Sequence, residues 1–107
     1  MATNLSTTLE IAEGIQYQSA TEIIPYSITT TNWVSSPTSP VCAVYDETDE
    51  TDVTTTVMPT NNPTAALDVI SLSPLKLLTK GHTYRIEVLW TVGSAKYECY
   101  FRVRCEL

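Results

Sequence analysis

The sequence contains few of the groups on which most functional classes depend. It has six Lys and Arg residues, three Cys and one His among 107 residues, and residues 1–75 contain no Lys or Arg. Nucleic-acid binding is therefore not expected, because its affinity comes from cations that neutralise phosphates. No apolar run approaches the roughly 18 residues of a membrane span. The N-terminus also lacks the basic and apolar regions of a signal peptide, so we expect synthesis in a cytoplasm and no membrane partner.

The rest of the composition indicates one folded domain. A chain of 107 residues falls within the usual size of a domain, and its 43% hydrophobic and 17% charged content argue against intrinsic disorder. A chain of this size buries about 65% of its unfolded surface on folding. We expect a modest core that needs neither metals nor disulfides.

The three cysteines form no CxxC pair. Cys99 and Cys105 lie on one expected strand, about 20 Å apart at roughly 3.3 Å per residue, which is too far for a disulfide. Cys42 can pair with only one of them, so a thiol remains and a reducing compartment is indicated. We expect buried, unpaired thiols. Because His82 is the sole imidazole, we expect no metal and no cofactor.

The C-terminal third predicts a β-hairpin. Apolar and polar residues alternate over residues 84–92 and again over residues 95–105, on either side of Gly93-Ser94. A two-residue loop with Gly first suits a type II′ turn. Pairing Val92 with Ala95 sets every inward residue opposite another inward residue, including Trp90 opposite Tyr97.

A tyrosine corner is predicted just before this hairpin. Leu78, Gly81 and Tyr84 follow one another at intervals of three residues. In such a corner the tyrosine hydroxyl bonds to the backbone of the preceding turn, at a crossover between two packed sheets.

The remaining strands are shorter. We expect them at residues 23–31, 41–45, 53–57 and 67–72, with a further one at 11–17. A short helix competes only at residues 7–15. About seven short strands separated by Pro, Gly and Asn favour an all-β, immunoglobulin-like antiparallel β-sandwich, with a jelly roll or small barrel as the alternative. We assign residues 23–107 to the sandwich and residues 1–22 to an N-terminal arm or extra strand, and we expect the arm to fold onto a partner.

Several segments together resemble a known group of proteins. They are Tyr26–Trp33, Pro37–Pro40 leading into Val44–Asp46, Asp52–Met58, Val69–Leu72 and Leu78–Arg85. Over residues 23–106 the chain is similar to small immunoglobulin-like proteins of tailed phages and prophages. The resemblance implies a non-enzymatic structural role in a virion, such as a capsid decoration or a head- or tail-associated subunit. It implies a major capsid or other virion protein as partner and several copies in an assembly, but it carries over no functional residues.

Catalytic patterns are lacking. No G-x-S-x-G motif is present, and Glu87 and Glu98 fall on the outer face of the hairpin rather than across a cleft. His82 is expected to be a surface or capping residue. We therefore do not expect an enzyme.

The acidic stretch from Asp46 to Asp52 holds five carboxylates within seven residues. It lacks the spacing and the glycine of a calcium loop. We interpret it as a solvated hairpin loop, with Ca²⁺ binding as the alternative.

The candidate contact residues come from the arm, one loop and the hairpin. They are Leu5, Leu9, Trp33, Arg85, Arg102 and Arg104. The arginines lie with Lys96 on the outer face of the hairpin, which either neutralises acids of earlier strands or forms a basic dock for an acidic surface. A second hypothesis is a carbohydrate-binding or adhesion module that stacks sugars on Trp33 and Tyr26.

Overall fold

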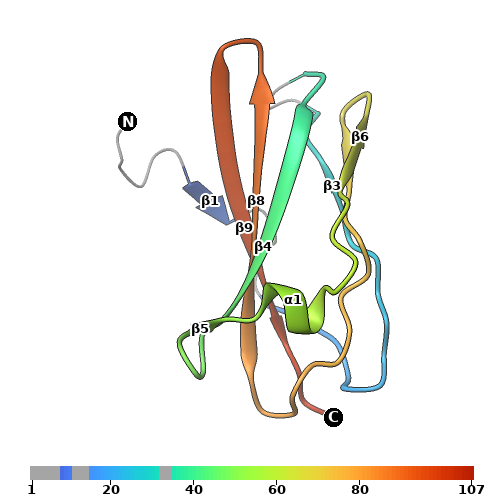
Figure 1. Cartoon of the computed structure of the whole chain (residues 1–107), viewed down its shortest axis with the longest axis vertical. Coiled ribbons are helices and arrows are strands. Elements are labelled where there is room, and N and C mark those ends of the chain that lie inside the picture. Colours follow the sequence, from blue (N-terminus) through green and yellow to red (C-terminus); the bar gives the residue numbers. More distant parts are fainter. Residues whose placement is uncertain (1–7, 11–14, 32–34) are drawn as a thin grey trace.

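Two β-sheets enclose the hydrophobic core in the computed structural model of the protein (Figure 1). The structure describes residues 8–10, 15–31 and 35–107. The larger sheet has the strand order β1-β9-β8-β4-β5, with β2 also pairing with β9, and the smaller sheet has the order β3-β7-β6. The elements are β1 (Thr8–Glu10), β2 (Gln16–Tyr17), β3 (Ser27–Thr29), β4 (Thr38–Asp46), β5 (Thr51–Asp52), α1 (Thr54–Val57), β6 (Thr64–Ala66), β7 (Val69–Ser71), β8 (Thr83–Val92) and β9 (Ala95–Arg104).

The predicted hairpin is confirmed in its register. β8 and β9 pair from Val92 with Ala95, through Trp90 with Tyr97, to Thr83 with Arg104. Gly93 has φ +61°, the left-handed value that the first central position of a type II′ turn requires. Most inward residues of both strands are buried, Trp90 completely, whereas Val92 and Tyr97 near the turn are partly buried. Period-two alternation and a two-residue turn together leave only this register.

The tyrosine corner is also confirmed. The backbone N–H of Thr79 donates to the Tyr84 hydroxyl oxygen at 2.7 Å, and the Tyr84 ring is buried. Gly81 has φ +89° in the turn between them, a conformation that a side chain would strain. The corner connects the segment after the smaller sheet to the start of β8.

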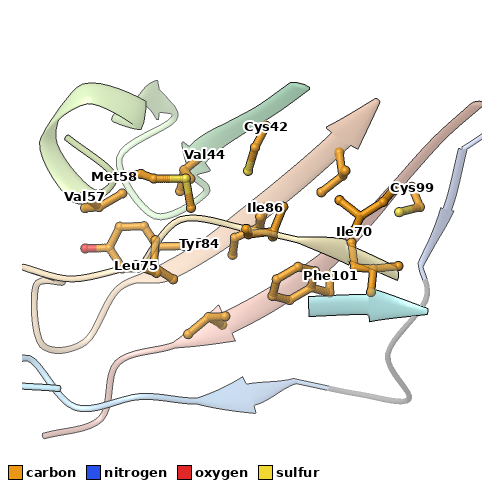
Figure 2. Close-up of a cluster of buried hydrophobic side chains, with 14 of the residues drawn as sticks. Cys42, Val44, Val57, Met58, Ile70, Leu75, Tyr84, Ile86, Cys99 and Phe101 are labelled. Carbon is orange, nitrogen blue, oxygen red and sulfur yellow. The ribbon is translucent and has the colours of Figure 1, made fainter. Parts of the chain in front are cut away.

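The core is formed by side chains from both sheets and from the connections between them (Figure 2). Ile70 of the smaller sheet and Ile86 of the larger one are both completely buried, and Phe101 lies near them. Tyr84 and Leu75 form the other end of the labelled cluster, close to Val57 and Met58. The predicted all-β packing of two sheets is therefore present.

The strand predicted at residues 53–57 is wrong, because residues 54–57 form the short helix α1. Val57 and Met58 are adjacent in the sequence and both are buried. A strand sends consecutive side chains to opposite faces, so it cannot bury both against one core. The helical turn also aims the Thr54 hydroxyl at β4, where its oxygen accepts a hydrogen bond from the Val44 N–H at 2.8 Å.

Helix α1 and the residues on either side of it help to cover the edge of β4 where its pairing with β5 ends. The Val44 carbonyl accepts a hydrogen bond from the Val53 N–H at 3.0 Å. The Asn61 side-chain amide donates to the Cys42 carbonyl at 2.8 Å. Covering an edge in this way prevents pairing with a further strand, so this part of β4 is not offered for strand addition.

The N-terminal segment belongs to the larger sheet. β1 and β2 both run parallel to β9, with Leu9 opposite Cys99 and Tyr17 opposite Arg104. The sheet is therefore mixed rather than purely antiparallel, and the helical alternative is wrong for residues 8–10. The strands β1, β5 and β6 were not expected, so the described residues form nine strands rather than about seven.

A buried glutamine fixes the end of this segment. Gln18 is 2% exposed; its Nε2 donates to the carbonyls of Leu75 at 2.6 Å and Glu22 at 3.0 Å. Its Oε1 accepts a hydrogen bond from the Tyr26 hydroxyl at 3.0 Å. Residues 16–18 are thus part of the fold. The expectation that the arm folds onto a partner stays a prediction.

Cys42, Cys99 and Cys105 are unpaired and buried, as predicted. Burial raises the pKa of Cys42 and of Cys99 to about 12, with smaller contributions from nearby acidic groups. Both thiols therefore remain protonated at neutral pH. Within the part of the chain that the structure describes, no helix is long and apolar enough to cross a membrane.

Candidate functional site

The face of the larger sheet that points away from the core carries charged and aromatic side chains. They alternate with the buried residues of β4, β8 and β9. The register places Tyr45, Arg85 and Arg102 in one row across the three strands, and Glu87 beside Tyr100 in the next row. We call Tyr45, Glu47, Arg85, Glu87, Tyr100 and Arg102 the outer-face cluster.

Glu47 holds the two central arginines of this cluster. One carboxylate oxygen accepts a hydrogen bond from Arg102 Nε at 2.9 Å, and the other accepts one from Arg85 Nη1 at 3.2 Å. Arg85 Nε also donates to Glu87 at 2.8 Å. Like charges directly opposite each other destabilise a sheet, and Glu47 offsets that repulsion between Arg85 and Arg102.

Both arginines also lie over tyrosine rings. The guanidinium carbon of Arg85 is 5.0 Å from the centroid of the Tyr45 ring, and that of Arg102 is 5.3 Å from the centroid of the Tyr100 ring. Cation–π contacts of this kind contribute about 0.5–1 kcal/mol at exposed sites. Ion pairs and ring contacts together leave these long side chains with little rotational freedom.

The acidic loop is only partly solvated, which corrects the sequence interpretation. Asp46 ends β4 with its side chain 5% exposed, and its Oδ2 lies 2.8 Å from His82 Nδ1. Its Oδ1 accepts hydrogen bonds from the backbone N–H groups of Thr48 and Asp49, at 2.9 and 3.1 Å. Asp49 Oδ2 also lies 3.8 Å from His82 Nδ1, and Glu47 pairs with two arginines. Three of the five acids of this stretch therefore contact β8, β9 or the turn before β8.

These contacts shift the ionisation of both groups. Burial alone would raise the pKa of the Asp46 carboxyl, but the hydrogen bonds from His82, Asp49 and Thr48 outweigh it and lower that pKa. The hydrogen bond to Asp46 raises the pKa of His82 against the opposing effect of desolvation. His82 is therefore held in a specific contact rather than presented as a free surface group.

The predicted contact residues have different outcomes. Leu5 and Trp33 lie outside the described residues, and Leu9 is placed only as a backbone position in β1. Arg85 and Arg102 meet on Glu47. Arg104 forms an ion pair with Glu106 and donates to the Thr83 hydroxyl at 2.9 Å.

The structure also decides between the two outcomes considered for the hairpin arginines. Arg85 and Arg102 neutralise an acid that follows β4, because β4 pairs with β8. Sequence reasoning missed Tyr45, Glu47 and Tyr100 as members of this site. The alternation of apolar and polar residues placed Tyr45 and Tyr100 on the outward face of their strands. It does not specify that β4 is the strand that lies beside β8.

Tyr26 does not form an exposed sugar-stacking platform. Its ring is partly buried, with its centroid 5.2 Å from that of Phe101, and its hydroxyl donates to Gln18. Burial raises the pKa of this hydroxyl, and Glu22 adds to the shift. Tyr26 is therefore a structural residue of the sandwich.

Comparison with known proteins found no matching family model, no matching curated protein and no matching solved structure.

Proposed function

We propose that this protein is a non-enzymatic structural component of a tailed-phage virion, a capsid decoration or a head- or tail-associated subunit. In this proposal it acts through protein–protein contacts and occurs in several copies. The resemblance of residues 23–106 motivates the biological setting. The outer-face cluster is the observation that carries the binding role.

The order of the strands supports an immunoglobulin-like fold within this proposal. In such folds, strands B, E and D are neighbours in one sheet and strands C, F and G in the other, and a tyrosine corner lies near the start of F. The orders β3-β7-β6 and β4-β8-β9 can be aligned with these two sets. The Tyr84 corner then lies at the start of the strand that corresponds to F.

The outer-face cluster has the chemistry of a protein-binding surface. Tyrosine and arginine are enriched among the residues that contribute most to protein interfaces. Here two of each lie on neighbouring strands. Glu47 and Glu87 hold the two arginines, and each arginine lies over a tyrosine ring. A surface that is ordered before binding loses less side-chain entropy when it binds.

The charges within the cluster indicate how a partner is recognised. Because Glu47 and Glu87 offset Arg85 and Arg102, a strongly acidic partner is not required. We expect recognition through hydrogen bonds and aromatic contacts to a virion protein. In addition to this cluster, Arg104, Leu5, Leu9 and Trp33 remain predicted contact residues. The sugar-binding hypothesis loses Tyr26 as a stacking residue, because its ring packs in the sandwich, and its other stacking residue, Trp33, lies outside the described residues.

Co-sedimentation with capsids and tails of the phage or induced prophage that encodes the chain tests this proposal. Tyr100→Ala should abolish or strongly reduce co-sedimentation while leaving thermal unfolding close to that of the unchanged protein. Thr29→Ala, on the exposed face of the smaller sheet, is the matched control and should bind normally. Absence of the chain from purified virions, or equal binding by Tyr100→Ala and Thr29→Ala, would refute it.

A further inference from the structure

Three metal-ligating side chains from two separate turns converge at one end of the larger sheet. Asp46 and Asp49 come from the connection between β4 and β5, and His82 comes from the turn before β8. One donor atom from each lies within 4.8 Å of the other two. We propose that Asp46, Asp49 and His82 form a binding site for one Zn²⁺ ion.

The spacing of the donors suits a small ion. Zn–N and Zn–O bonds of about 2.0–2.2 Å in a tetrahedral site place neighbouring donors roughly 3.3–3.6 Å apart. His82 Nδ1 lies 2.8 Å from Asp46 Oδ2 and 3.8 Å from Asp49 Oδ2. Both distances lie within about 1 Å of that range, so modest side-chain movements complete the site. In doing so, Zn²⁺ displaces the proton shared by His82 and Asp46.

The two turns are already fixed to each other. The Glu47 N–H donates to the Thr83 carbonyl, and the Thr83 N–H donates to the Thr48 hydroxyl, each at 2.9 Å. The Oδ1 atom of Asp46 is held by two backbone N–H groups, which leaves Oδ2 directed at His82. Such outer contacts orient a ligand before the metal arrives.

The third ligand, Asp49, is exposed, so its side chain can move and solvent can reach the site. The Asp49 side chain is 62% exposed, whereas those of His82 and Asp46 are 20% and 5% exposed. Asp49 can therefore adjust to a metal that binds first to the two more buried donors. The open side beside Asp49 leaves room for water as a fourth ligand, which is the arrangement of zinc sites with three protein ligands.

The donor set selects zinc over calcium. Ca²⁺ takes six to eight oxygen ligands, whereas this group offers one imidazole nitrogen and two carboxylates. Imidazole suits Zn²⁺ and related first-row metals. The calcium alternative considered for residues 46–52 included neither His82 nor a nitrogen ligand.

Isothermal titration of the untagged full chain with ZnCl₂, and separately with CaCl₂, tests the site. One Zn²⁺ per chain should bind, and Ca²⁺ should not. Zn²⁺ at about 100 times its Kd should raise Tm by roughly 12 °C, the mass-action stabilisation divided by the unfolding entropy of a chain of this size. Co²⁺ should give the visible absorption of a tetrahedral ion.

Two variants of the same loop distinguish a defined metal site from nonspecific attraction of Zn²⁺ to a negatively charged loop. Asp49→Asn should weaken Zn²⁺ binding at least about 10-fold, the lower limit of the loss from an altered outer-shell partner. Glu50→Gln removes the same charge one residue away, outside the donor set, and should bind within about twofold of the unchanged chain. Equal affinities for the two variants, no heat of Zn²⁺ binding up to 1 mM, or Ca²⁺ binding as tight as Zn²⁺ would overturn the proposal.

Discussion

Replacement of Gln18 by Ala tests whether the N-terminal segment is an integral part of the sandwich. The Gln18 side chain is buried, and its amide makes three hydrogen bonds to Leu75, Glu22 and Tyr26. Truncation removes all three and leaves the Leu75 carbonyl and the Tyr26 hydroxyl without this partner. The Leu75 carbonyl keeps its hydrogen bond from the Ile24 N–H at 3.1 Å, so residue 75 stays bonded to the backbone of this segment.

The magnitude follows from the hydrogen-bond count. A hydrogen bond contributes about 1 kcal/mol net, and an unsatisfied buried partner costs about 1–3 kcal/mol. Three lost bonds at about 1 kcal/mol each lower the free energy of unfolding by about 3 kcal/mol. Water can replace the lost bond at the Glu22 carbonyl. For 107 residues at about 2.1 cal/mol/K per residue, this loss of stability corresponds to a fall of roughly 13 °C in Tm.

Urea and thermal unfolding, followed by circular dichroism, measure this loss. Gln16→Ala is the matched control, because Gln16 lies two residues away in β2 and is exposed; it should change stability by less than about 0.5 kcal/mol. A loss below about 1 kcal/mol for Gln18→Ala, or equal losses for the two variants, would refute the reasoning. Residues 16–22 would then lie outside the cooperative fold.

Three other substitutions and one thiol-reactivity assay test separate features of the structure. Tyr84→Phe keeps the buried ring but removes the corner hydrogen bond, and should cost about 1–3 kcal/mol in urea unfolding; a smaller loss would contradict its structural role. Leu67→Gly relieves φ +55° at an exposed residue and should stabilise by about 0.5–1 kcal/mol, the left-handed strain less the added chain entropy; a lower Tm would count against it. Glu47→Gln should cost about 1 kcal/mol in low salt and less in 0.5 M NaCl, and a loss independent of salt would exclude the ion-pair explanation. Cys42 and Cys99 should resist Ellman's reagent at pH 8 until urea unfolds the chain, since their pKa values are about 12; rapid reaction in the folded state would show that they are accessible.

Prediction succeeded where neighbours in the sequence are neighbours in space. The hairpin and the corner depend on residues within about 20 positions of one another, and their periodicity and turn residues are sufficient to define them. The prediction failed at residues 54–57, because Thr and Val residues have strand propensity and therefore indicated a strand. Burial of the adjacent Val57 and Met58 overrides that propensity.

The candidate site was harder to predict because its members come from distant segments. The arginines were correctly placed on the outer face of the hairpin, but Glu47 was assigned to a solvated loop. Its hydrogen bond with Arg102 spans 55 residues, and that between His82 and Asp46 spans 36. Charge and alternation mark such residues as polar and outward, yet they do not specify their partners.

By itself, the sequence determined the all-β class, the register of β8 and β9, the tyrosine corner and the burial of three unpaired cysteines. These features follow from local alternation, turn residues and strand geometry, which act within a short stretch of chain. Only the tertiary structure decided that Gln18 belongs to the interior, that Glu47 lies between two arginines and that Asp46, Asp49 and His82 converge. The physical reason is that a buried or paired polar group is stabilised by its specific partner, and only the packing of distant segments brings that partner within hydrogen-bonding distance.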